Sequence, residues 1–153
     1  MANLEWCKKQ SSGLQKVEPS ENIAEDHFRS AEESLKVLRK VMDGSRMWAA
    51  TVKYYVEYFC VSAVLSRLGV KSEIHDCTIA AVEFLEEEGV FQQGTTRRLE
   101  KSKELRIDNQ YNLKERSVEL DLEELSDFIL ETKEIMEGLH RKRVNELRSK
   151  LFR

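Results

Sequence analysis

The fold is decided by an apolar stretch in the first half of the chain, residues 45–69, which reads SRMWAATVKYYVEYFCVSAVLSRLG. Ser45 is a good N-cap and Gly69 a natural C-terminal stop, so the stretch predicts a helix that ends at about Leu68. The apolar side chains occupy at least two sides of that helix: Trp48, Val52, Tyr55 and Phe59 on one, and Tyr54, Tyr58, Val61 and Leu65 on another. Because a helix that is apolar nearly all round must be covered on several sides, we expect it to be the central helix of a bundle.

Two charged residues interrupt this apolar surface. Lys53 and Glu57 are four residues apart, so they share one face of the helix and can pair. Partly buried charges must find partners. Three interpretations stay open: the two residues line a polar cleft, form a structural pair, or bridge two protomers.

The segments on either side also predict helices. Before the central helix, Ser20 is a good N-cap and Asp43-Gly44 a natural end. Between them, apolar residues repeat at spacings of 4, 3, 4, 3 and 4, which is the pattern of one helix face: Ala24, Phe28, Ala31, Leu35, Leu38 and Met42. After it, a helix capped by Ser72 and stopped by Gly89 is expected, followed by a weaker one from about Thr96 to between Ile107 and Tyr111.

The last predicted helix opens with a reciprocal cap, Asp121 with Glu124. Its apolar pattern continues to Leu151, which gives a rod of roughly 45 Å. That is longer than a compact domain of this size needs, so its C-terminal third would project. The sequence therefore predicts an all-α fold, an antiparallel bundle of four or five helices over residues 20–153, with an extended leader over residues 1–19.

Composition agrees with this class. The chain has 153 residues, of which six are glycine and one is proline, too few for the frequent turns of an all-β fold. The longest apolar segment, Tyr54–Leu65, contains Glu57 and is shorter than the roughly 20 residues of a membrane span. Residues 1–10 contain no apolar run of the kind found in signal peptides. We therefore expect a cytoplasmic protein that does not enter a membrane.

Three cysteines stand at positions 7, 60 and 77. The number is odd, and no two cysteines lie within the spacing of metal ligands. The pattern predicts neither a disulfide framework nor a zinc site, and it favours a reducing compartment. Cys60 and Cys77 are expected to be small core residues.

The C-terminal segment is basic: residues 140–153 contain six basic residues and one acidic residue. The candidates for binding nucleic-acid phosphates are Arg141, Lys142, Arg143, Arg148 and Lys150. The other interpretation is that these cations favour the dipole at the end of a helix. The second is favoured, because three of the five are consecutive and cannot all face one groove.

Several short motifs occur in a recognisable order. Lys53, two tyrosines and a further aromatic pair lie on the central helix, and Gly69 and the segment 71–75 (KSEIH) follow. Farther on, residues 105–111 (LRIDNQY) place an arginine before an Asp and a Tyr, and the leader contains residues 5–10 (EWCKKQ). Over about residues 5–140 the chain resembles the small stand-alone prokaryotic branch of the HEPN domains (higher eukaryotes and prokaryotes nucleotide-binding).

This resemblance implies a helical bundle that forms a two-fold homodimer. It also implies pairing with a small nucleotidyltransferase, as in toxin–antitoxin operons, or binding of a nucleotide. Some relatives are metal-independent RNases whose active site is an arginine, four to six residues, and then a histidine. Here seven residues lie between Arg67 and His75, one more than that pattern allows, and Gly69 is among them. The spacing therefore favours a binding module over an RNase toxin.

If the chain cleaves RNA, His75 is the candidate general base and Arg67 or Lys71 the candidate cation. Otherwise His75 is a first-turn helix residue that pairs locally with Glu73 or Asp76. The central tyrosines could stack a nucleobase, but on an apolar helix we expect core and dimer contacts instead, with Tyr54 and Tyr58 as candidate interface residues. The three histidines lie far apart along the chain, so we expect no bound metal and no cofactor.

Overall fold

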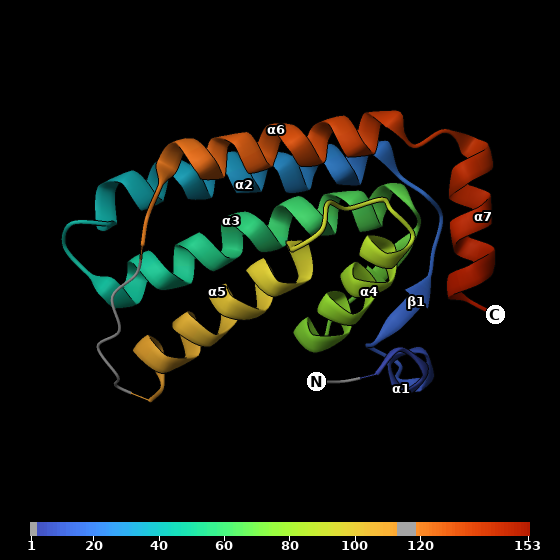
Figure 1. Ribbon diagram of the computed structural model, residues 1–153, viewed down its shortest axis with the longest axis horizontal. Coiled ribbons are helices and arrows are strands. Elements are labelled where there is room, and N and C mark those ends of the chain that lie inside the picture. Colours follow the sequence, from blue (N-terminus) through green and yellow to red (C-terminus); the bar gives the residue numbers. More distant parts are fainter. Residues whose placement is uncertain (1–2, 113–118) are drawn as a thin grey trace.

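The computed structural model describes residues 3–112 and 119–153, and most of these are helical (Figure 1). The larger elements in chain order are α2 (Glu21–Val41), α3 (Arg46–Arg67), α4 (His75–Glu87), α5 (Thr95–Gln110), α6 (Leu122–Gly138) and α7 (Arg141–Leu151). Three short elements complete the fold: α1 (Leu4–Lys9), β1 (Leu14–Lys16) and β2 (Val70–Ser72).

Helix α3 lies at the centre, as its sequence predicts. It packs against α2, α5 and α6, and Figure 1 shows it between α2 and α6 on one side and α5 on the other. Tyr54, Val56 and Val61 are completely buried. The predicted caps of α2 and of α3 itself are also present: Ser20 Oγ accepts from the Ile23 amide at 3.1 Å, and Ser45 Oγ accepts from the Trp48 amide at 3.2 Å.

The single long C-terminal helix was a wrong expectation. The helix is interrupted at Leu139 and His140, and α7 runs in a different direction, across one end of the bundle (Figure 1). The Leu139 carbonyl accepts a hydrogen bond from Arg67 Nη2 at 2.8 Å, which holds the break in place. The turn lets α7 bury its own apolar face, formed by Val144, Leu147 and Leu151, which would otherwise project into water.

The leader is also more ordered than expected. Strand β1 pairs with β2 in an antiparallel ladder in which Leu14 lies opposite Ser72, so the fold is all-α except for this two-stranded sheet. Because β2 includes Ser72, α4 begins only at His75, later than the expected cap.

A disulfide joins Cys7 in α1 to Cys77 in α4. The expectation that the cysteines form no disulfide was therefore wrong, although Cys77 lies in the core as expected, and the cysteines no longer favour a reducing compartment. The two partners are 70 residues apart in sequence, a separation at which spacing gives no signal. Cys60 is free and buried, as predicted.

The N-terminal segment and α7 both approach Gly69, which has a φ of 70°. Arg148 Nη1 donates to the carbonyls of Val17, Leu68 and Gly69 at 2.8–2.9 Å. A Cβ at position 69 would lie 2.0 Å from this nitrogen, so glycine is required for both the φ angle and the close approach. No helix within the described ranges is long and apolar enough to cross a membrane.

Candidate functional site

One side of α3 carries a group of aromatic rings around a histidine. The Tyr54 hydroxyl lies 2.9 Å from His75 Nδ1, and the Tyr58 ring stacks on the imidazole with centroids 4.3 Å apart and an interplanar angle of 19°. Tyr55 meets the same imidazole edge-on at 6.2 Å. These four residues, together with Arg106 of α5, are called the His75 cluster below. His75 is only half-buried, so a ligand can reach it.

Two cations from α5 lie beside this histidine. The Arg106 guanidinium lies 5.5 Å from the Tyr54 ring centroid and 5.4 Å from that of Tyr55, and Lys103 forms an ion pair with Asp76. Burial, and then the charges of Arg106 and Lys103, lower the pKa of His75 below its usual 6.5, while Asp76 acts in the opposite direction. The imidazole is therefore neutral at pH 7, which is the form that can accept a proton.

The cations expected beside His75 lie elsewhere. Arg67 donates to the Leu139 carbonyl and lies 3.5 Å from a Glu21 carboxylate oxygen, and Lys71 lies 3.3 Å from Glu73. The hydrogen bond described for His75 is to Tyr54 rather than to Glu73 or Asp76, although the Asp76 carboxylate acts on the pKa of the imidazole.

The sequence did contain a signal for the cation that lies beside His75. Arg106 is the arginine of the 105–111 motif, but it lies on a different helix from His75. Spacing along the chain could not show that the two meet.

Beyond the His75 cluster, the aromatic surface continues toward α2. Tyr55, Tyr58 and Phe59 are half-buried, and His27 stacks on Phe59 with centroids 6.3 Å apart. These four residues are called the aromatic face. Burial lowers the pKa of His27, so this ring too is neutral at pH 7. A cavity of about 510 Å³ adjoins the face; its lining includes Val17, Ile23, Leu65 and Val70.

A different side of α3 carries charged residues. Glu57 is completely buried, and its Oε2 accepts from Arg98 Nε at 2.6 Å and lies 3.4 Å from Lys53 Nζ. Lys53 Nζ also donates to Ser102 Oγ at 2.8 Å. These residues line a cavity of about 710 Å³ between α3, α5 and the start of α6, called the Glu57 pocket. Lys53 and Glu57 thus form an ion pair and also line a polar cavity.

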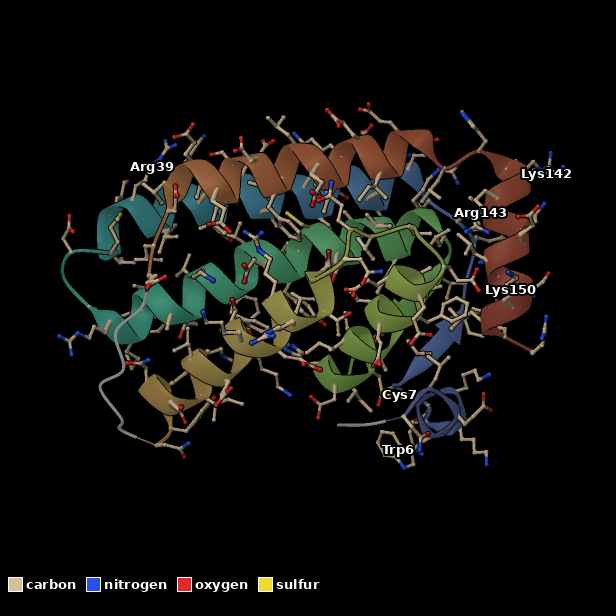
Figure 2. All side chains as sticks on the ribbon, in the orientation of Figure 1. Trp6, Cys7, Arg39, Lys142, Arg143 and Lys150 are labelled. Atoms are coloured by element: carbon tan, nitrogen blue, oxygen red, sulfur yellow. A yellow bond between two sulfur atoms is a disulfide. The ribbon has the colours of Figure 1, made fainter. Side chains whose placement is uncertain are left out.

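The basic C-terminal residues mostly hold α7 to the bundle (Figure 2 shows Lys142, Arg143 and Lys150 on this helix). Arg143 Nη2 donates to the Glu88 carbonyl at 2.7 Å, and Lys150 Nζ lies 3.0 Å from a Glu88 carboxylate oxygen. Arg148 is bound to three carbonyls near Gly69. Five cations were expected either to bind phosphates or to favour the helix dipole. Three of them, Arg143, Arg148 and Lys150, therefore contact other parts of the protein.

Within residues 3–112 and 119–153, no group of three or more His, Cys, Asp or Glu side chains could hold a metal ion. Among the described residues, two groups with polar side chains that could bind a ligand are the His75 cluster, which combines a neutral imidazole with a guanidinium, and the Glu57 pocket, which is lined by opposite charges.

Comparison with known proteins identifies the family of the chain. No curated protein matches the chain in a sequence comparison. The HEPN domain family matches residues 24–142, which span α2 to the first turn of α7 and so contain both groups of side chains. That match covers well over half of the sequence, and this chain therefore belongs to the HEPN family.

Proposed function

We propose that the chain acts as a homodimeric binding module. The observation that carries this proposal is the aromatic face: Tyr55, Tyr58 and Phe59 remain half-exposed although they lie on the central helix. Aromatic side chains are enriched at protein interfaces, where their large rings are buried between two subunits. A two-fold contact would place this face against its own copy.

The proposed ligand of the dimer is a nucleotidyltransferase-type protein, as in toxin–antitoxin pairs, and a nucleotide is the alternative. Membership of the HEPN family supports this proposal. A neutral, half-exposed His75 with Tyr58 stacked on it offers hydrogen-bonding and stacking groups to either.

Light scattering at micromolar concentration tests the dimer. We expect about twice the 17.9 kDa of one chain. Tyr55→Glu should shift the mass to one chain, because a charge would be buried in the contact. Leu130→Glu, which changes a 57% exposed leucine on α6, should remain dimeric. A wild-type mass near 17.9 kDa would overturn the proposal. Co-purification with a nucleotidyltransferase-type protein encoded beside it tests the partner.

A second candidate function is metal-independent RNA cleavage, which the pairing of a neutral His75 with Arg106 favours. In this reaction a base removes the proton of a ribose 2′-hydroxyl, and a cation stabilises the charge that develops on the phosphate. His75 would be the base and Arg106, with Lys103, the cation. The earlier candidates, Arg67 and Lys71, already contact Leu139, Glu21 and Glu73.

RNA degradation by the purified protein in EDTA tests this second candidate. His75→Ala should slow cleavage by about 10²–10⁴-fold, as expected for loss of a general base. Arg106→Ala should slow it strongly, whereas Lys71→Ala should leave it nearly unchanged. If the wild type and His75→Ala are equally inactive while both remain folded dimers, the RNase candidate is excluded and the binding module stands.

A further inference from the structure

The hydroxyl group of Tyr54 decides which nitrogen of His75 carries a proton. Tyr54 is completely buried, and its hydroxyl oxygen lies 2.9 Å from His75 Nδ1. A buried O–H group that donates to nothing is costly, and most such groups in proteins are satisfied. The side chain has no exposed surface, and the residues that the structure describes offer the hydroxyl no other acceptor. The Tyr54 O–H must therefore donate to His75 Nδ1.

The opposite direction of this hydrogen bond would leave a buried proton without an acceptor. If the neutral imidazole carried its proton on Nδ1, that N–H would donate to the Tyr54 oxygen, and the Tyr54 O–H would need a second acceptor. Ionisation of the tyrosine would remove that need. However, burial and then the neighbouring Tyr58 raise the pKa of Tyr54 above its usual value and outweigh the effect of Arg106, so the hydroxyl keeps its proton.

A chain of hydroxyl groups keeps the neighbouring tyrosine away from Nδ1. Ser72 Oγ donates to the Ile74 carbonyl at 3.1 Å, and Thr78 Oγ1 donates to Ser72 Oγ at 2.9 Å. Each hydroxyl has a single proton, so in the 3.2 Å contact between Tyr58 and Thr78 the tyrosine must be the donor. These bonds hold the Tyr58 ring nearly parallel to the imidazole, at 19°, and leave Nδ1 to Tyr54.

The proton of the imidazole therefore lies on Nε2. The ring is neutral at pH 7, so it carries one N–H group, and Nδ1 is the acceptor. Within residues 3–112 and 119–153, no hydrogen bond to Nε2 is formed, and Nε2 is not a buried atom without a partner. It therefore reaches solvent, and the accessible nitrogen of His75 is an N–H donor.

We propose that Tyr54 is a positioning residue that holds His75 in the Nε2–H tautomer, so that the His75 cluster presents a hydrogen-bond donor and not a base. The group that this cluster recognises is then an oxygen acceptor, to which the Arg106 guanidinium offers further donors. This role rests on the proposed binding module, which supplies the ligand. It counts against the RNA-cleavage candidate, because an N–H donor cannot remove the proton of a 2′-hydroxyl. The mass of the dimer and the tautomer are measured separately, so either proposal can fail alone.

Long-range ¹H–¹⁵N NMR spectra of the labelled full chain test the tautomer directly, because a protonated and an unprotonated ring nitrogen differ strongly in chemical shift. Above pH 7 we expect the Nε2–H pattern for His75, with its signals assigned by their loss in His75→Gln. Tyr54→Phe keeps the ring but removes the donor, so we expect a mixture of both tautomers. The pKa of His75 should also rise, because the bond that stabilised the neutral form is lost. An Nδ1–H pattern in the wild type would overturn the proposal.

Tyr58→Phe is the matched control. It also removes a hydroxyl group from the cluster and keeps the ring that stacks on His75, so the tautomer and the pKa should stay as in the wild type. Both variants retain the other groups that face the imidazole: Arg106 and Lys103 from α5, Asp76 from α4 and Tyr55 from α3. Equal changes in the two variants would overturn the proposal. If Tyr54→Phe fails to fold, the wild-type tautomer decides.

RNA degradation in EDTA gives a second readout if the wild type shows it. The side-chain amide of glutamine can donate a hydrogen bond but cannot take up a proton, so His75→Gln separates a donor from a base. We expect His75→Gln to retain most of any cleavage that His75→Ala loses. Equal losses of about 10²-fold or more in both variants are the result of removing a general base and would overturn the proposal.

Discussion

The His75 cluster and the Glu57 pocket lie on different sides of α3 and hold their polar groups in different ways. In the cluster, an uncharged imidazole is bonded to a tyrosine hydroxyl and stacked on a ring. In the pocket, a fully buried carboxylate is held between Arg98 and Lys53. On one side of the helix the half-buried histidine is uncharged, and on the other side the buried carboxylate is paired with cations.

This difference separates two kinds of binding. Neutral, half-exposed rings can be covered by another protein surface at little desolvation cost. A charged pocket is more costly to cover with an apolar surface, but it can recognise a small ligand by complementary charges. The aromatic face therefore suits a protein contact and the Glu57 pocket suits a small polar molecule.

The largest expected effect concerns the disulfide that anchors α4, the helix that carries His75. Cys7→Ser removes a link across 70 residues and should lower the free energy of unfolding by about 4 kcal/mol. Chemical denaturation measures this loss. Dithiothreitol should destabilise the wild type by a similar amount and leave Cys7→Ser unchanged. Equal stability of the wild type and of Cys7→Ser without reductant would show that the disulfide does not stabilise the His75 side.

Arg98→Ala tests the charged side. The substitution leaves Glu57 buried with Lys53 as its remaining cation, and we expect a loss of about 3 kcal/mol in the free energy of unfolding. Arg29→Ala is the matched control, because its pair with Asp26 is exposed and should contribute less than about 1 kcal/mol. Similar losses in the two variants would contradict the difference drawn between the pocket and the rest of the surface.

Tyr54→Phe tests the neutral side with the loss of a single oxygen. The His75 Nδ1 atom would lose its partner while the ring packing stays, so we expect a cost of about 1 kcal/mol. Tyr111→Phe, at a 64% exposed position, should change stability by less than about 0.5 kcal/mol. A cost for Tyr54→Phe as large as that for Arg98→Ala would mean that the two sides do not differ as described.

The smallest expected effect is a pH dependence of the neutral side. The pKa values of His27 and His75 are lowered in the folded protein, so on acidification the unfolded chain binds protons first. Stability should therefore fall as the pH drops below about 6.5 and stop falling through these groups once the folded histidines are protonated as well. Melting temperatures between pH 7.5 and 5.5 measure this, and the His27→Gln/His75→Gln double variant should give a flatter profile. An equally steep profile for the double variant would assign the effect to other groups.

The fold could be predicted from the sequence to the extent that its causes are local. The caps at Ser20, Ser45 and Asp121 are as predicted, because a capping side chain bonds to amides two or three residues away. The break at Leu139 could not be predicted, because the apolar pattern continues through it. The turn exists because Arg67 and the end of the bundle are nearby in space.

The candidate site divides in the same way. Lys53 and Glu57 could be paired from their spacing on one helix. The positions of Arg106 beside His75 and of Arg98 beside Glu57 could not be predicted, because the sequence offers many cations that would suit either position equally well.

By itself, then, the sequence determined that the protein is a helical bundle with a central, nearly all-apolar helix, because helix periodicity and capping act over a few residues. It also carried the motifs of the HEPN family. The tertiary structure alone decided that Cys7 meets Cys77, that α7 folds back, and that His75 lies between tyrosines and Arg106. These contacts join residues far apart in the chain, and only the packing of the helices selects one partner among several that are chemically equivalent.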